Sequence, residues 1–400
     1  MALAIWILVR RRPVRRPPDW HAPGAARSGR TGTLVLHMRL IVLLLLSVVL
    51  LSGCTDLYTG RTGTVVDAHV VRVVEQGTRA AGAPGLPGQP FQRLEIQLDG
   101  GLYRGDVVTL EWGGRNALNA QGLLAPGDAV LVSQRRDGDV RQYAIEEIVR
   151  LPSLLPVAAL LLVLLLLVAR WRGLAALVGL AMSVAVFLLA IVPAVQRGED
   201  PLISTLIGSL AVVGVAVFVV HGPNRKSLAA LVGTAVSLGA VLVLSAGTLV
   251  LAHITGLGSE EAVFLAVGSG GTIDLHRLVL AGIVVGSLGA LVDMGIGQAS
   301  ATMELAAADP DFGGRRLYAS ALNVGRDHIG SLVNTLALAY FGGALPSIVL
   351  LSLGNAPLIL ALNGETIAGS LIAILVASVG LVLSVPVTTA VAVALAPRRG

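Results

Sequence analysis

Seven long apolar runs fill this 400-residue chain from residue 152 onward and constrain its fold more than any other feature. They lie at 152–169, 173–195, 201–220, 227–252, 275–300, 328–352 and 366–396. Each run is long enough to cross about 30 Å of hydrocarbon as an α-helix. Hydrophobic residues make up 54% of the chain and charged residues 13%. We therefore predict an α-helical polytopic membrane protein.

A basic arm and a shorter apolar run precede these segments. Residues 1–37 are rich in Arg and Pro, which predicts a disordered arm and is also typical of a start codon assigned upstream of Met38. Residues 38–54 end in Ser52-Gly53-Cys54. This pattern indicates either an uncleaved signal anchor or a lipoprotein signal with lipidation at Cys54. We favour the anchor because the later spans make a lipid anchor unnecessary. The predicted total is then eight spans, or seven if cleavage precedes Cys54.

Residues 58–150 have the pattern of a small β domain. Apolar residues alternate in TGTVVDAHVVRVV, LEIQL, DVVTLEW, DAVLVSQ and VRQYAIEEIV, and Gly, Pro and Asp separate these runs. Period-two alternation between such turns predicts an antiparallel barrel of OB-like type. Its ionisable residues have no spacing that suggests a site. The domain is expected to be exported, because it follows the first apolar run.

The basic residues of the loops predict the orientation. Every second gap between the apolar runs contains Arg or Lys, and the alternate gaps are acidic or neutral. The basic gaps contain Arg170 and Arg172, Arg225 and Lys226, Arg315 and Arg316, and Arg398 and Arg399. Positive loops stay in the cytoplasm. We therefore expect a multi-pass protein of the plasma membrane, with the β domain outside, a membrane domain at 151–396 and a cytoplasmic tail at 397–400.

Two polar stripes follow helical spacing in neighbouring segments. The first, in the run that starts at residue 275, is interpreted as a packing face with two carboxylates, and it contains Gly282, Gly286, Gly289, Asp293, Gly297 and Glu304. The second leads into the next run and contains Asn323, Arg326, Asp327, Gly330, Asn334 and Thr335. Small residues let helices approach closely. We therefore expect Asp293 to face protein, and Arg326 to pair with Asp293 or Glu304.

These stripes have two explanations. An ion pair would only lock two helices together, whereas a polar pathway would also use the amides and hydroxyls around it. The pathway is favoured, because one salt bridge does not require so many polar groups at membrane depth. Pro386 adds a predicted kink and packing position in the last run, where Ser and Thr hydroxyls can satisfy the carbonyls that the proline frees.

Several functional classes have no support in the residues. Cys54 is the single cysteine, and the chain contains neither HExxH nor GxxxxGK[ST]. We expect no metal, no cofactor, no nucleic-acid partner and no catalytic residue. The expected partners are the lipid bilayer and either further copies of the chain or an envelope protein.

Three motifs resemble a known family. The runs GALVDMGIGQASATMEL at 289–305, ALNVGRDHIGSLVNTLALAYFGGALP at 321–346 and GLVLSVPVTTAVA at 380–392 are similar to the YibE/F family of bacterial multispanning membrane proteins. The resemblance covers about 58–396. The resemblance brings no catalytic assignment. It does imply a structural or functional role for the positions of the family motifs, which are Asp293, Glu304, Asn323, Gly325, Arg326, Asp327, Gly330, Asn334, Thr335, Tyr340 and Pro386.

The sequence leaves two functional hypotheses. A transporter or channel-like permease of unknown substrate would use the two polar stripes as its pathway. A non-transporting scaffold or accessory subunit would present the β domain to an envelope partner, which the absence of internal repeats favours. We favour transport because ionisable groups at membrane depth are costly.

Overall fold

A computed structural model describes residues 59–60, 63–79, 88–113, 122–137, 140–309, 311, 313–354 and 357–397. The expectations for the arm at 1–37, the signal segment at 38–54 and lipidation of Cys54 lie outside these residues.

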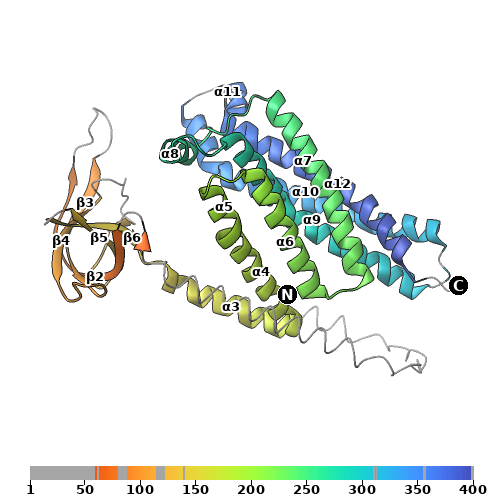
Figure 1. The fold of residues 1–400 in the computed structure, drawn as a ribbon, viewed down its shortest axis with the longest axis horizontal. Helices are drawn as coiled ribbons and strands as arrows, with labels where there is room; N and C mark the ends of the chain where they lie inside the picture. Colours follow the sequence, from red (N-terminus) through yellow and green to blue (C-terminus); the bar gives the residue numbers. More distant parts are fainter. Residues whose placement is uncertain are drawn as a thin grey trace, which may run out of the picture. The chain divides into compact units, whose positions relative to one another are not determined.

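The β domain is a half-barrel of antiparallel strands (Figure 1). The strands run in the order β4-β3-β2-β5-β6, and β1 pairs with β2. Their bounds are β1 Thr59–Gly60, β2 Gly63–Arg79, β3 Gln89–Leu98, β4 Val107–Trp112, β5 Ala129–Asp137 and β6 Val140–Ile148. Alternate residues such as Val66, Leu94 and Val132 fill the core. Each of the five alternating segments in the sequence forms a strand, because alternation places every second side chain on the buried face.

Helices occupy the described chain from Leu151 onward. Their bounds are α3 Leu151–Ala169, α4 Trp171–Val186, α5 Val192–Gln196, α6 Pro201–His221, α7 Arg225–Leu251, α8 Glu260–Gly268, α9 Leu275–Ala308, α10 Gly314–Leu353, α11 Leu358–Asn363 and α12 Glu365–Leu395. Within the described residues, seven helical segments are long and apolar enough to cross a membrane. They coincide with the seven predicted runs, although α10 begins at Gly314 instead of at residue 328.

A π-helical turn interrupts the second of these segments. It covers Phe187–Ile191 between α4 and α5. Ile191 is buried and contacts α6 at Gly208. If Gly208 had a side chain, its Cβ atom would lie only 2.5 Å from the Ile191 side chain. The π turn therefore sits where this span packs against its neighbour.

Three helices form a closely packed centre: α7, α9 and α12 (Figure 1). Gly233 of α7 contacts Thr388 of α12, and Gly295 of α9 lies against the Thr234 hydroxyl, 2.6 Å from an added Cβ. Buried hydroxyls bond within their own helix, as when Ser237 Oγ donates to the Gly233 carbonyl at 2.9 Å. Small residues thus let these backbones approach, and some of the buried hydroxyls, such as that of Ser237, are satisfied within their own helix.

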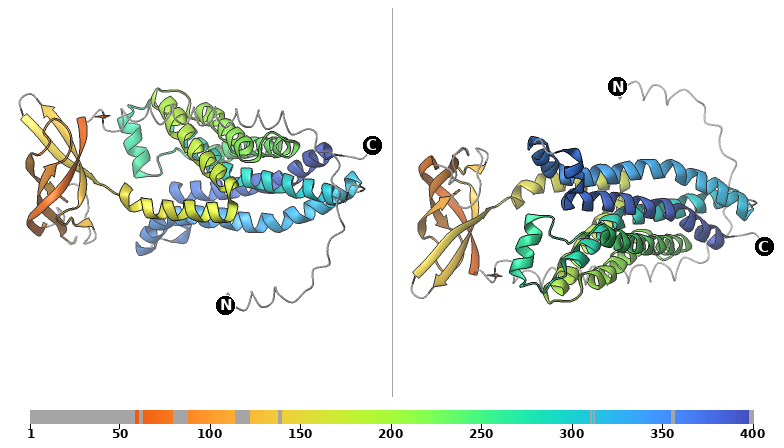
Figure 2. Two further views of the ribbon diagram at one scale, coloured as in Figure 1. Left: turned by 90° about the horizontal axis from the view of Figure 1, so that it is seen from below. Right: turned by 90° about the horizontal axis from the view of Figure 1, so that it is seen from above.

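Helix α10 packs mainly along α12, and the two lie side by side in both views of Figure 2. Within α10, Leu336 and Gly325 are buried on the packed face. Other parts of the chain leave most of the remaining surface of α10 exposed.

The two ends of the helical bundle are defined by polar contacts. At the Arg225 end, Arg225 Nη1 donates to the carbonyl of Leu395 at 3.3 Å. At the Glu365 end, the Glu365 carboxylate accepts from the amides of Thr255 at 2.8 Å and Gly256 at 2.6 Å. Helix α9 ends, and α10 begins, at the Arg225 end.

The predicted orientation can be tested at the two turns that flank α6. Gly198 and Gly222 precede and follow this helix, and both have positive φ. Because α6 is long enough to span, fusions of alkaline phosphatase and of a fluorescent protein after each glycine should report opposite sides, with Gly198 outside. Reports from the same side at both positions would contradict the topology.

Candidate functional site

The glycine and acidic stripe of α9 lies on the face of the helix that the chain leaves uncovered. Its exposed members are Gly282, Gly286, Gly289, Asp293, Gly297 and Glu304. The opposite face is buried and contains Leu291, Gly295 and Gln298. An added Cβ would meet no atom within 4 Å at four candidate packing positions, Gly282, Gly289, Gly297 and Gly330.

This placement corrects one sequence expectation. The stripe was expected to pack against another helix of the chain, yet in the described residues only Gly286 meets one, at the Tyr340 hydroxyl. Other glycines do lie against a neighbouring helix, among them Gly233, Gly295, Gly325 and Gly380. The physical reason is that α9 has small residues on both faces, so their spacing does not select one.

The polar stripe of α10 is also exposed. Its members Asn323, Arg326, Asp327, Gly330, Asn334 and Thr335 all lie on uncovered surface. Arg326 Nη1 donates to Asn323 Oδ1 at 2.9 Å, and Thr335 Oγ1 donates to the Ser331 carbonyl at 2.9 Å. Both contacts join residues three or four apart in one helix.

The expected ion pairs with Arg326 are not formed in the described part of the chain. Gln298 lies opposite Gly325, whose added Cβ would be 2.6 Å from Gln298 Oε1. Asp293 and Glu304 are five and six residues away from Gln298, which is roughly 8 to 9 Å along the helix axis. Along the helix axis, Asp293 and Glu304 thus lie on either side of the level at which Gln298 meets Gly325.

The two stripes nevertheless border one another. Arg326, Gly330 and Tyr340 lie on one side of α10, within about 80° of one another around the helix axis. Tyr340 contacts Gly286 on the α9 stripe. We call this junction the α9–α10 seam. It comprises Gly282, Gly286, Gly289, Asp293 and Gly297 of α9, with Asn323, Arg326, Asp327, Gly330, Asn334 and Tyr340 of α10.

A pocket of about 270 Å³ adjoins this seam at the Glu365 end of the bundle. Its wall includes Gly282, Tyr340, Glu365 and Ser370. The Tyr340 hydroxyl is buried and has no hydrogen-bond partner in the described residues. A buried hydroxyl without a partner is unfavourable, and the side chain that carries this one also lines the pocket.

Glu365 was not singled out from the sequence, although it organises the pocket. Besides the two backbone amides, it accepts from Thr255 Oγ1 at 2.9 Å. These bonds hold the connection after α7 against the start of α12. The sequence offered little indication of this role. An acidic residue in the first turn of a helix is common because it interacts favourably with the helix dipole, and Glu365 at the start of the last apolar run fits that ordinary explanation.

A second contact that sequence reasoning missed lies at the same end. Asp200 caps α6 by accepting from the amide of Leu202 at 2.9 Å, and it also accepts from Arg277 of α9. Asp274 caps α9 through the amide of Arg277 at 3.0 Å. The signal for Asp200 was available, because Asp before Pro at the start of an apolar run is typical of a helix N-cap.

Gln298 is the buried polar link between three helices. Its Nε2 donates to the Ala321 carbonyl of α10 at 2.8 Å and to Thr389 Oγ1 of α12 at 2.6 Å. Thr389 lies within one turn of Pro386, which is half-buried within the continuous helix α12. Gln298 thus fixes the Arg225 half of the bundle, next to the seam.

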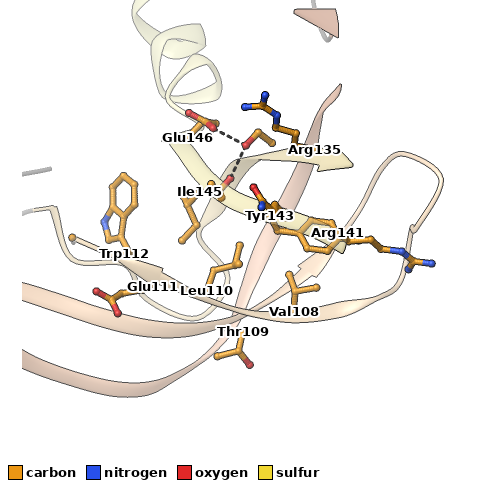
Figure 3. Close-up of a pocket in the computed structure, with 14 residues that line it drawn as sticks. Val108, Thr109, Leu110, Glu111, Trp112, Arg135, Arg141, Tyr143, Ile145 and Glu146 are labelled. Atoms are coloured by element: carbon orange, nitrogen blue, oxygen red, sulfur yellow. Dashed lines mark hydrogen bonds between the residues drawn. The ribbon is translucent and has the colours of Figure 1, made fainter. Parts of the chain in front are cut away.

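The β domain also contains a pocket, of about 1060 Å³, between β4 and β6 (Figure 3). Leu110, Trp112 and Ile145 line it, and Glu146 accepts from Ser133 Oγ at 2.6 Å. Between β2 and β3, the hydrogen bond from Arg72 holds the pKa of Glu95 below its ordinary value. No partner chemistry follows from this lining, in which Arg and Glu are mixed.

A search of the described residues finds no group of three His, Cys, Asp or Glu side chains placed to hold a metal ion. The seam holds one guanidinium, carboxylates and amides. This donor set suits hydrogen bonding and charge pairing with a solute.

Comparison with known proteins gives one match. A family model described as YibE/F-like protein matches residues 157–398, which include the whole seam and leave the β half-barrel outside the match. Neither the curated proteins nor the solved structures contain a match. Because the matched segment covers more than half of the chain, the protein belongs to the YibE/F-like family.

Proposed function

We propose that the protein is a transporter or channel-like permease whose pathway follows the α9–α10 seam. The observation that carries this proposal is the continuity of the seam. It begins at a pocket that contains an unpartnered tyrosine hydroxyl and continues to Asp293, Asn334 and Arg326. Ionisable groups in membrane segments cost roughly 2.5 to 3.5 kcal/mol each near the bilayer centre, so they mark pathways or binding sites.

The seam has three parts in this proposal. The pocket admits a small polar or charged solute at the Glu365 end. The contact between Tyr340 and Gly286 is the narrow point. Beyond it, Asp293, Asn334 and Arg326 replace part of the solute's hydration shell. No residue of the seam is assigned a catalytic step.

The orientation and the membrane belong to the same proposal. We place the protein in the plasma membrane with the Arg225 end in the cytoplasm, because Arg225, Arg315 and Arg316 lie there. The seam then opens outward through the pocket.

The charges of the seam are tested by Asp293→Asn combined with Arg326→Gln. If these two charges take part in transport, the variant should insert and fold but should not reverse the phenotype of a deletion strain. The phenotype is found first by screening that strain against metals, organic ions and envelope stress. Folded protein is quantified in the same membranes by thermal unfolding.

A matched control is Arg197→Gln combined with Glu199→Gln, which removes an exposed ion pair of 2.8 Å outside the seam. This control should complement fully. Full complementation by the seam variant as well would rule out the pathway and leave the scaffold hypothesis, in which the protein presents its β domain to an envelope partner.

A further inference from the structure

Asp293 of the seam lies far from the ends of the helices along the bundle axis. Thr234 Oγ1 of α7 donates to the Leu291 carbonyl of α9 at 3.3 Å, so Asp293 lies near the level of Thr234. Thr234 is nine residues after Arg225, where α7 begins, which corresponds to about 13 Å along the axis. Asp293 is therefore well inside the span, and its side chain is exposed on the surface of the single chain.

The fully exposed positions of α9 carry no large apolar side chain. Every exposed residue of α9 is glycine, alanine or charged. By contrast, the exposed residues of α3 include many Leu and Val side chains, such as Leu160 and Val163. Lipid-facing helices are covered by large apolar side chains, whereas small residues mark faces where another helix approaches. This face of α9 therefore needs a protein cover.

The seam is also complementary to itself. Arg326 and Asp327 are neighbours on the exposed face of α10, and neither makes an ion pair in the described residues. A two-fold axis along the membrane normal keeps equal residues at equal depth. It can bring Arg326 of each copy opposite Asp327 of the other, so that the same ion pair forms twice across the axis. The exposed glycines of α9 allow the two backbones to approach.

We propose that a second copy of this chain covers the α9–α10 seam and forms a two-fold dimer with the seam at its interface. The dimer does not depend on the proposed function, because charges at membrane depth need a protein cover in a scaffold as well. If the transport proposal holds, the two copies enclose the pathway between them.

The dimer is tested with the full chain, with Cys54 replaced by serine, in native membranes. Single cysteines at Gly289 and Gly297 probe the seam, and a short bismaleimide joins the two thiols. The matched control is Val236→Cys, because Val236 is exposed on α7 and lies outside the seam. We expect crosslinked dimers from both seam positions and monomers from the control. Monomers at all three positions, or equal crosslinking at all three, would overturn the proposal.

A charge swap tests the pairing itself. Asp327→Arg should reduce the dimer several-fold in lipid nanodiscs, as measured by mass photometry, because it places like charges across the axis. Arg326→Asp combined with Asp327→Arg should restore the dimer, because position 326 of each copy would again face a side chain of opposite charge at position 327 of the other copy. Thermal unfolding confirms that each variant is folded. An unchanged dimer in Asp327→Arg, or no recovery in the swapped variant, would refute the paired interface.

Discussion

Replacing Gly233 by alanine is expected to lower the free energy of unfolding by about 2 kcal/mol, in the range found for overpacked cores. The added methyl group would overlap the Thr388 side chain and would lie 3.1 Å from the Thr388 Cα. A backbone atom cannot move aside alone, so α7 and α12 would have to separate. Thermal unfolding of the purified protein in one detergent measures the loss.

Gly239→Ala is the matched control on the same helix. An added Cβ there meets no atom within 4 Å, and alanine has the higher helix propensity, by about 1 kcal/mol in soluble helices. Gly239→Ala should therefore unfold at the same temperature as the wild type or at a higher one. Equal losses from both substitutions would show that α7 and α12 are not closely packed at Gly233.

Truncation of Tyr340 to alanine should make liposomes that contain the protein several-fold more permeable to protons or small ions. The Tyr340 ring and hydroxyl lie between the pocket and the charged part of the seam, against Gly286. Removing the ring and its hydroxyl should connect the pocket to the charged part of the seam. The rate at which an imposed pH gradient decays, read from an enclosed pH-sensitive dye, measures the effect.

Two variants separate this effect from general damage. Tyr340→Phe keeps the ring and should leak little more than the wild type. Phe341→Ala removes the next aromatic ring of α10. Phe341 is 40% exposed and lies on a different face of α10 from Tyr340. If Phe341→Ala leaks as much as Tyr340→Ala, Tyr340 is not the narrow point of a pathway.

The spans and strands could be predicted because each depends on a strong local signal. A helix that crosses hydrocarbon must satisfy its own backbone and remain apolar over its length, so hydropathy located all seven described spans. The strands of the half-barrel have one buried and one exposed face, and their alternation located them. The start of α10 was missed because residues 314–327 include four charged side chains and continue the helix beyond the apolar run.

The faces of the helices could not be predicted in the same way. In a soluble protein the buried face is the apolar one, but lipid is as apolar as the interior of a bundle. Gly289 and Gly295 therefore look alike in the sequence, although Gly295 is buried and Gly289 is exposed. The candidate residues of the seam were found by their polarity. Gln298 and Glu365 were missed because their roles depend on long-range contacts.

The π turn at Phe187–Ile191 makes the second described span tolerant of a change in length. A π turn accommodates one residue more than an α turn, and the helix on either side keeps its direction. Deleting one residue from 187–190 would therefore convert the turn to regular α-helix and leave Ile191 facing Gly208. A deletion in the middle of α7 would instead rotate all later residues by about 100° and turn its glycines away from α12. Related chains that differ in length by one residue within a span should carry the insertion or deletion at 187–190.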